Sequence, residues 1–262
     1  MTQRYVGQAM KRKEDPRLVS GTSTYVDDVV LPGMLHMAVT RSIHAHARIK
    51  RVDISKAQKL PGVVAVVTGE EAAAQCGPIP CAASIPDMKN AQRHLLAVDK
   101  VRFVGEPVAV VVAENKYIAR DAADLIEIDY EPLAAVVNPE KAMDPASPRL
   151  YDEFSDNIAY NFAFESGNTE EAFQKADVIV KERFINQRLA PVAMEPRGVV
   201  ATYQMPDNEL VVWCSTQQPH GLRTLLANLL RVPENKTRVI APEVGGGAAK
   251  LICTPKTDLS AM

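Results

Sequence analysis

Two segments late in the chain decide how its second half folds: WCSTQQPH at residues 213–220 and VIAPEVGGG at residues 239–247. The first predicts a strand that ends in a polar Thr-Gln-Gln turn, and the second predicts a strand that opens into three glycines. Glycines permit positive φ and let backbone N–H groups approach a ligand closely. The two segments are therefore typical of a protein that surrounds a bulky cofactor carrying phosphate.

Short strands and short helices alternate along the rest of the chain, which predicts a mixed α/β (α+β) fold. Strand patterns occur at residues 35–40, 48–52, 63–67, 101–104, 108–113, 126–130, 176–184, 198–203 and 210–215. Helix patterns occur at residues 53–60, 116–125, 169–175 and 220–230. Asn115 is placed to cap the second of these, and the last has an apolar face of Leu222, Leu225, Leu226 and Leu229. The run at 63–67 is continuously apolar, so we expect that strand to be buried on both faces.

Two stretches predict irregular structure. Residues 72–92 are rich in Gly, Pro, Ser and Asn, which predicts a long loop. Residues 132–151 contain four prolines and no periodicity, so we predict a linker between two domains there.

Composition and charge argue against some classes of binding partner for this chain. The 30 Lys and Arg nearly balance the 32 Asp and Glu, for a formal charge of −2, which does not favour nucleic acid or an anionic membrane. The longest apolar runs are too short to span a bilayer, and the first residues lack the apolar core of a signal peptide. We therefore expect a cytoplasmic protein without nucleic acid binding or membrane insertion.

The four cysteines, at positions 76, 81, 214 and 253, include no C-x-x-C pair. Their spacing builds neither a disulfide framework nor an iron–sulfur site, so we predict free thiols. A bridge between Cys76 and Cys81 is the alternative.

Nine motifs recur in one order along almost the whole chain: GQAMKRKEDPRL (7–18), YVDD (25–28), LPGMLH (31–36), RSIHAHAR (41–48), LPGVVAVVTG (60–69), VGEPVAVVV (104–112), MEPRG (194–198), STQQPH (215–220) and APEVGGG (241–247). In order and spacing this set resembles the large, molybdopterin-binding subunit of the xanthine dehydrogenase, aldehyde oxidase and aerobic carbon monoxide dehydrogenase family. The resemblance implies an α/β hammerhead domain at residues 17–133, a Pro-rich linker at 134–151, and the truncated start of a molybdopterin-binding α+β domain at 152–262.

The resemblance also implies a chemistry and a set of partners. The family oxidises or hydroxylates a small molecule such as carbon monoxide, an aldehyde or an N-heterocycle, and takes the oxygen from water. Its cofactor is molybdenum bound to molybdopterin, in bacteria commonly the cytosine dinucleotide form. Electrons pass to [2Fe-2S] clusters on a small subunit and to FAD on a medium subunit, and the resemblance leaves pairing of two large subunits open.

Gln217 is the strongest candidate site residue. A molybdenum centre with an oxo ligand needs a neutral hydrogen-bond donor that neither titrates nor ligates the metal, and a glutamine amide meets both conditions. In the family the Gln of the Ser-Thr-Gln motif has this role, and the resemblance carries it to Gln217. A glutamine that caps the end of a strand and binds backbone is the alternative.

The glycines Gly245, Gly246 and Gly247 are predicted to bind the cofactor through backbone N–H groups, with a flexible turn as the alternative. The family continues as GGGFGxK, whereas this chain reads GGGAAK at residues 245–250, one residue shorter and without the aromatic. A misplacement of about 1 Å can cost on the order of 100-fold in rate, so we expect this loop to be impaired. In a shifted reading frame one coding of residues 252–257 gives Leu-Tyr-Pro-Glu-Asp, as in many relatives, which suggests a frameshift near Gly247.

Other polar residues are assigned structural roles. His44 and His46 could share one face of a strand and bind metal, but no Cys or carboxylate stands at ligand spacing. His220 is expected to shape the loop after Gln217. Glu195 is expected to pair with Arg188 or Arg197.

No residue of this chain is assigned as catalytic or as a metal ligand. The family's general base is a glutamate near the end of the full-length subunit, and loss of a general base costs roughly 10²–10⁴-fold in rate. We therefore expect a fragment that is inactive alone. The alternatives are a docking protein that keeps the hammerhead domain without cofactor, and an enzyme split between two genes.

Overall fold

Three small sheets carry the fold in the computed structural model, which describes residues 5–81, 85–187, 189 and 192–246. The strands are β1 (His36–Arg41), β2 (Ala47–Asp53), β3 (Val63–Thr68), β4 (Lys100–Val101), β5 (Pro107–Ala113), β6 (Glu127–Pro132), β7 (Val199–Gln204), β8 (Glu209–Cys214) and β9 (Thr237–Ile240). The α-helices are α1 (Asp15–Ser20), α2 (Ser55–Gln58), α3 (Gly69–Gln75), α4 (Lys116–Asp124), α5 (Pro139–Ala142), α6 (Thr169–Gln174) and α7 (Pro219–Leu230). Strand orders are β1-β5-β3, β4-β2-β6 and β7-β8-β9, so the predicted mixture of helix and strand is confirmed.

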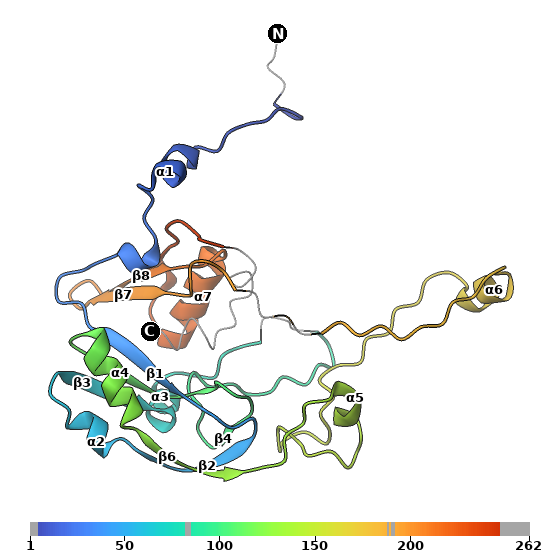
Figure 1. Cartoon of the computed structure of the whole chain (residues 1–262), viewed down its shortest axis with the longest axis horizontal. Coiled ribbons are helices and arrows are strands. Elements are labelled where there is room, and N and C mark those ends of the chain that lie inside the picture. The colour runs from blue at the N-terminus through green and yellow to red at the C-terminus, as the bar shows by residue number, and fades with distance from the viewer. Residues whose placement is uncertain (1–4, 82–84, 188, 190–191, 247–262) are drawn as a thin grey trace.

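The first sheet is built around β5. Its sequence PVAVVVA is buried almost throughout, and it pairs antiparallel with β1 on one side and β3 on the other. Helix α4 packs on this sheet through Ala119, Ala122 and Ala123, and Asn115 caps the helix as the sequence indicates. Leu95 from the same half of the chain packs against the core of the third sheet, which lies beside the first two (Figure 1).

Our prediction of a doubly buried strand at residues 63–67 is wrong. This segment is β3, which lies at the edge of its sheet, and Val64 is 56% exposed. The strand covered on both faces is β5. A run of apolar residues indicates only that a strand can be buried. Whether both of its faces are buried depends on which strands and helices pack beside it in the fold.

Two further expectations for the first half need correction. The strand predicted at residues 101–104 is shorter, because β4 ends at Val101. It belongs to the second sheet and β5 to the first, with Gly105 at φ +86° between them. The predicted loop at 72–92 begins inside a helix, α3. A capping box starts that helix, in which Thr68 and Glu71 each bind the other's backbone N–H.

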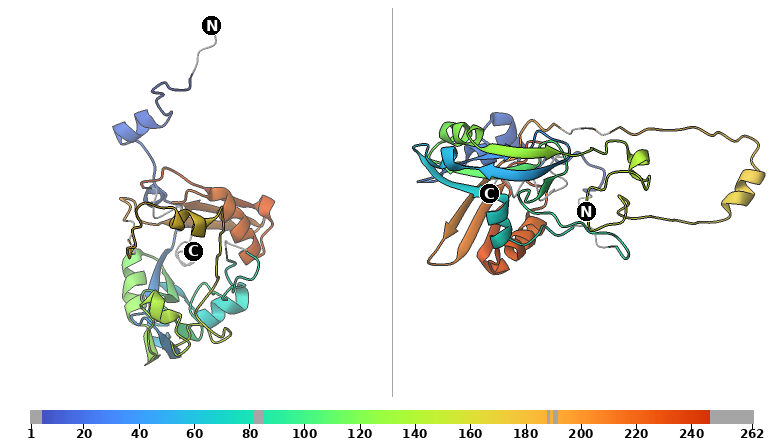
Figure 2. Two further views of the ribbon diagram at one scale, coloured as in Figure 1. Left: turned by 90° about the vertical axis from the view of Figure 1, so that its right-hand side faces the viewer. Right: turned by 90° about the horizontal axis from the view of Figure 1, so that it is seen from below.

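Residues 176–184 form no strand, contrary to our prediction. They belong to an exposed segment, residues 159–187, which we call the arm: two extended legs joined by α6 (Figures 1 and 2). No described strand pairs with either leg. Alternating side chains produce a strand only where a neighbour completes the backbone hydrogen bonds.

The third sheet follows the prediction closely. Strands β7 and β8 form an antiparallel hairpin whose turn contains Asn208 at φ +52°. Helix α7 then crosses over to β9, which pairs parallel with β8. The apolar face of α7 is as expected, with Leu222, Leu226 and Leu229 buried in the core.

The described cysteines, Cys76, Cys81 and Cys214, are free thiols, as predicted. Among the described residues, no helix combines the length and the apolar character that a bilayer crossing requires.

Candidate functional site

Three loops meet at one edge of the third sheet. Because β8 and β9 are parallel neighbours, with Trp213 paired to Ile240, their carboxyl ends lie together. Strand β7 runs the other way, so its first residue, Val199, lies opposite Cys214 at the same edge. Segments 194–198, 215–218 and 241–246 therefore converge at the carboxyl ends of two parallel strands, where open α/β sheets commonly bind ligands.

Buried hydroxyl groups hold the turn after β8. Ser215 is 2% exposed, and its Oγ accepts a hydrogen bond of 2.9 Å from the N–H of Gly198. The Ser215 N–H donates back to the Gly198 carbonyl at 3.2 Å. Thr216, 1% exposed, accepts a hydrogen bond of 3.1 Å from the N–H of Gln218. Gln217 lies between these fixed residues and is exposed, so its amide is available to a ligand.

The glycine loop is joined to the segment before β7. The Gly245 N–H donates to Glu195 Oε2 at 2.7 Å, and the Glu195 N–H donates to the Gly245 carbonyl at 3.0 Å. A Cβ on Gly245 would lie 2.5 Å from Glu195 Cβ, and one on Gly246 would lie 2.7 Å from Ala193 Cβ. Both glycines are thus required by close packing within the protein. Gly246 also has the positive φ, +137°, that the glycine run suggested.

The N-terminal stretch holds the other side of the same loop. Glu243, just before the glycines, forms an ion pair with Arg17, and its N–H donates to the Thr24 carbonyl at 3.1 Å. A Cβ on Gly245 would also lie 3.2 Å from Cε1 of Tyr25. Residues 17–25 and Glu195 therefore fix the loop from two directions.

This role of Glu195 was not predicted from the sequence. The prediction was that Glu195 pairs with Arg188, which lies outside the described residues, or with Arg197. The position of Glu195 could have indicated this role. It lies four residues before β7, and β7 pairs with β8, which ends at the candidate site. Gly247, Cys253 and the tail that bears on the reading-frame hypothesis also lie outside the described residues.

The histidines form no metal site with each other. His46 is buried with its Nδ1 2.8 Å from the Ala134 carbonyl oxygen, whereas His44 packs edge-on against Tyr130 with ring centroids 4.9 Å apart. In the described parts of the chain, no three His, Cys, Asp or Glu side chains stand close enough to share a metal ion. His220 lies exposed in the first turn of α7.

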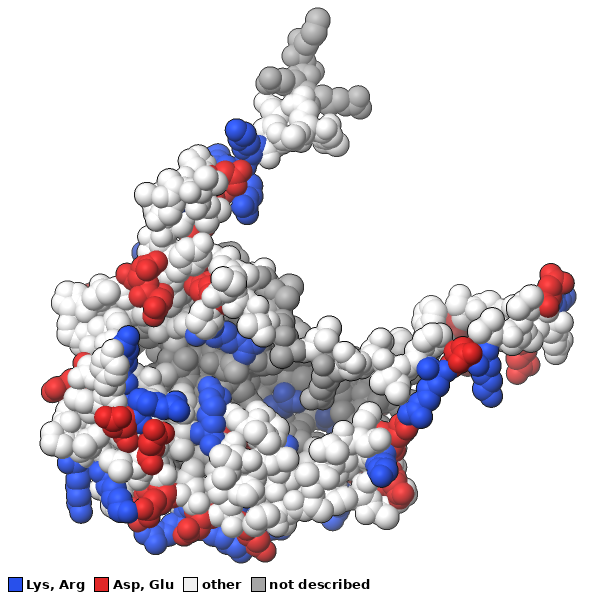
Figure 3. All heavy atoms as spheres, viewed as in Figure 1, with Lys and Arg blue, Asp and Glu red and all other residues white. Residues whose placement is uncertain are grey.

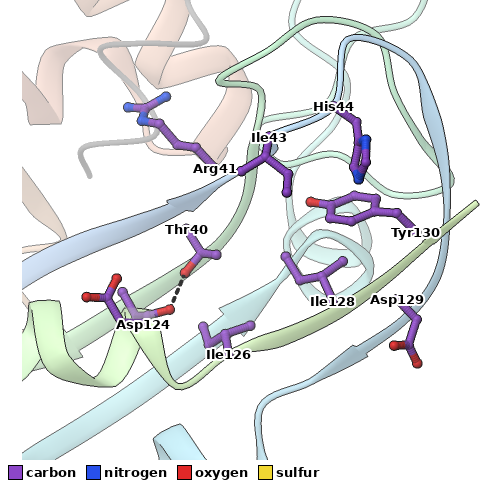
Figure 4. A pocket seen from close by; sticks show the side chains of 10 residues that line it. Thr40, Arg41, Ile43, His44, Asp124, Ile126, Ile128, Asp129 and Tyr130 are labelled. Carbon is purple, nitrogen blue, oxygen red and sulfur yellow. Dashed lines mark hydrogen bonds between the residues drawn. The ribbon is translucent and has the colours of Figure 1, made fainter. Parts of the chain in front are cut away.

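An open hollow of about 490 Å³ lies elsewhere, between β1, α4 and β6 (Figure 4). His44, Asp124 and Tyr130 are among its lining residues, and burial raises the pKa of the Tyr130 hydroxyl. None of the lining residues comes from the three loops described above. The hollow is therefore separate from the candidate site.

Two family models match the chain. The a/b hammerhead domain of aldehyde oxidase and xanthine dehydrogenase matches residues 20–134, and the molybdopterin cofactor-binding domain matches residues 150–247. The second match contains all three loops of the candidate site, with Gln217 and the glycines Gly245, Gly246 and Gly247.

Known proteins are similar over nearly the whole chain. The carbon monoxide dehydrogenase large chain of Afipia carboxidovorans is 41% identical over 255 residues, which cover 92% of this chain and 31% of that protein. The nicotinate dehydrogenase large molybdopterin subunit of Eubacterium barkeri is 35% identical, with 87% of this chain and 51% of that subunit covered. Among solved structures, quinoline 2-oxidoreductase from Pseudomonas putida 86 matches with a TM-score of 0.88 and 36% identity, over 98% of this chain and 34% of that one.

This chain thus spans about a third of the length of the carbon monoxide dehydrogenase and quinoline oxidoreductase chains, and about half that of the nicotinate dehydrogenase subunit. Two family matches in the expected order, a shared fold and more than 30% identity to several large subunits agree with one another. The chain belongs to the molybdopterin-binding large subunits of the xanthine dehydrogenase, aldehyde oxidase and carbon monoxide dehydrogenase family.

Proposed function

We propose that this chain supplies one wall of the molybdopterin site in a molybdenum hydroxylase that oxidises a small molecule with oxygen from water. The observation that supports this most is the meeting of the Gln217 turn and the glycine loop at the carboxyl edge of β8 and β9. Molybdenum held by molybdopterin, when bound, supplies the exchange of an oxygen atom and two electrons with the substrate.

The residues at this edge fit such a group. Gln217 is exposed and offers two N–H donors without a titrating charge, so it can orient an oxygen ligand without replacing it. Gly246 and Gly247 would present backbone N–H groups to an anionic part of the cofactor. The N–H of Gly245 is taken by Glu195, so its part in binding the cofactor would be to hold the loop in place.

The finer assignments follow the resemblance. We propose the cytosine dinucleotide form of the cofactor, an iron–sulfur small subunit and an FAD-binding medium subunit as partners, and a cytoplasmic location. The division into a hammerhead domain (17–133), a linker (134–151) and a molybdopterin-binding part (152–262) belongs to the same proposal. None of the residues discussed above is assigned as a general base, so the proposal includes that the chain alone is inactive.

Cofactor analysis tests this proposal directly. The chain would be purified from a host that makes molybdopterin, with the iron–sulfur and flavin subunits of a relative, and its molybdenum and pterin content measured. We expect both in the wild type, at least tenfold less in Gln217→Ala, and no change in Gln75→Ala, an exposed glutamine on α3. Metal-free wild-type protein that still binds those subunits would instead support the docking protein without cofactor.

A further inference from the structure

Residues 17–28, which we call the clasp, run from α1 to the loops at the edge of the third sheet. Figure 3 shows the residues before the clasp projecting away from the body of the protein. The hammerhead match begins at residue 20 and the molybdopterin match at residue 150, so neither of them includes Arg17. A role of Arg17 at the candidate site is therefore not implied by either match.

The clasp contacts two of the three loops at once. Val26 is 3% exposed and packs on the loop before β7, where a Cβ on Gly198 would lie 3.2 Å from its Cγ1. The carbonyl of Thr24 accepts the N–H of Glu243, in the loop after β9, at 3.1 Å. One short segment of the chain thus holds these two loops beside each other.

Arg17 adds a charged contact to this arrangement. Its Nε donates to Oε1 of Glu243, whose side chain is only 15% exposed. The backbone of Arg17 is fixed by the turn that ends α1, because its carbonyl accepts the N–H groups of Gly21, at φ +72°, and of Thr22. The guanidinium group is therefore held at Glu243 by a backbone turn on the clasp.

The charge of Glu243 bears on what the glycine loop is proposed to bind. Glu243 precedes Gly246 by three residues, which span at most about 11 Å of chain. The loop already carries the carboxylate of Glu195, so an unpaired Glu243 would add a second negative charge beside the proposed anion site. The ion pair with Arg17 compensates that charge.

We propose that Arg17 is a positioning residue for the cofactor loop, and that it acts through Glu243. It holds the loop after β9 in the shape seen here, and it offsets a negative charge where the anionic part of the cofactor would lie. The second of these effects rests on the proposed function, whereas the first does not depend on a bound cofactor.

Hydrogen exchange in cofactor-free protein tests whether Arg17 holds the loop. The full chain would be purified from a host that makes no molybdopterin, and the exchange of the Glu243 and Gly245 amides would be measured by NMR. We expect both amides to exchange at least tenfold faster in Arg17→Ala, with unchanged circular dichroism. Arg17→Lys, which keeps a cation in reach of Glu243, should restore most of the protection.

The matched control for this measurement is Arg12→Ala. Arg12 lies on the same N-terminal stretch, is 72% exposed and pairs with Asp15 on α1, so its loss should leave both amides as in the wild type. Equal exchange rates in Arg17→Ala and Arg12→Ala would overturn the proposal, whether or not the protein binds a pterin.

Pterin retention tests the effect of the charge. The variants would be made in a host that produces molybdopterin, with the partner subunits of a relative, and the pterin content measured after dialysis. We expect Arg17→Ala to retain at least fivefold less pterin than the wild type, with a smaller loss at high salt because salt screens the unpaired charge. Adding Glu243→Gln to Arg17→Ala removes that charge and should at least double the retained pterin.

The results separate this proposal from the proposed function. A double variant that retains no more pterin than Arg17→Ala would overturn the charge effect, because neutralising Glu243 would then have no benefit. Wild-type protein without pterin would overturn the proposed function, and the exchange rates of the cofactor-free variants would still decide whether Arg17 positions the loop.

Discussion

Glu195 and Gly245 bind each other through two hydrogen bonds, one from each backbone N–H, and their carbon atoms are too close to admit a side chain on the glycine. This contact joins the segment before β7 to the loop after β9. The two segments lie 50 residues apart in the chain. The shape of the glycine loop is therefore set by protein contacts before any ligand binds.

Gly245→Ala is expected to lower the free energy of unfolding by about 1–3 kcal/mol, because the new Cβ would lie 2.5 Å from Glu195 Cβ and force the two segments apart. Urea unfolding followed by the fluorescence of the single tryptophan, Trp213 on β8, would measure the change. Gly77→Ala is the control, since a Cβ there meets nothing within 4 Å. Similar losses in the two variants would contradict the packing argument.

Two replacements of Glu195 distinguish the contribution of its hydrogen bond to stability from the contribution of its charge. Glu195→Ala removes the acceptor for the Gly245 N–H and should cost about 1–2 kcal/mol of stability, whereas Glu195→Gln keeps an acceptor oxygen and should cost less than half as much. The amide exchange rate of Gly245, measured by NMR, should rise in the alanine variant. A glutamine variant as unstable as the alanine variant would show that the charge, and not the hydrogen bond, matters.

Ser215→Ala tests the turn that carries Gln217. Its hydroxyl is 2% exposed and accepts from the Gly198 N–H, so its removal leaves a buried donor without this partner and should cost about 1–3 kcal/mol. Ser166→Ala, which removes an exposed hydroxyl, should change the stability by less than about 0.5 kcal/mol. Thermal unfolding of both variants gives the comparison, and equal melting temperatures would refute it.

The ion pair between Lys100 and Asp152 predicts a response to acid. Lys100 is 2% exposed on β4, and its Nζ lies 2.7 Å from Asp152, which is 61% exposed. The hydrogen bond from Lys100 holds the pKa of the Asp152 carboxyl below its ordinary value. A carboxyl with a lowered folded pKa adds stability above its unfolded pKa, and this stability is lost as the pH falls below about 4.

Asp152→Asn should therefore reduce stability at pH 7 and flatten its decline between about pH 4 and pH 2. We expect a cost at pH 7 on the order of 1–2 kcal/mol, below the roughly 3–5 kcal/mol of a fully buried pair, because solvent screens the exposed carboxylate. Unfolding in urea at a series of pH values measures both effects. Parallel pH profiles for wild type and variant would exclude the ion pair as the cause.

Local patterns in the sequence were sufficient for most helices and strands. The polar cap at Asn115 and the leucine stripe of α7 identified those helices correctly, because caps and apolar spacing act within a few residues. Val64 and residues 176–184 were misjudged, because burial and strand pairing depend on neighbours that are distant in the sequence. Local sequence does not contain that information.

The sequence predicts residues of the candidate site but not their contacts. The family motifs indicate Gln217 and the glycines, whose role in cofactor binding stays a prediction. The parallel pairing of β8 with β9 explains why the loops that carry them meet at one edge. The links from Glu195 and Arg17 to the loop were not predicted. Each of them joins residues that are 50 or more positions apart.

The parallel pairing of β8 and β9 also has a consequence for the order of folding. A hairpin such as β7–β8 closes through a short turn, whereas the pairing of β9 with β8 closes a longer connection that contains the whole of α7. The edge that carries Gln217 and the glycine loop is therefore expected to assemble late, after the hairpin that supports half of it.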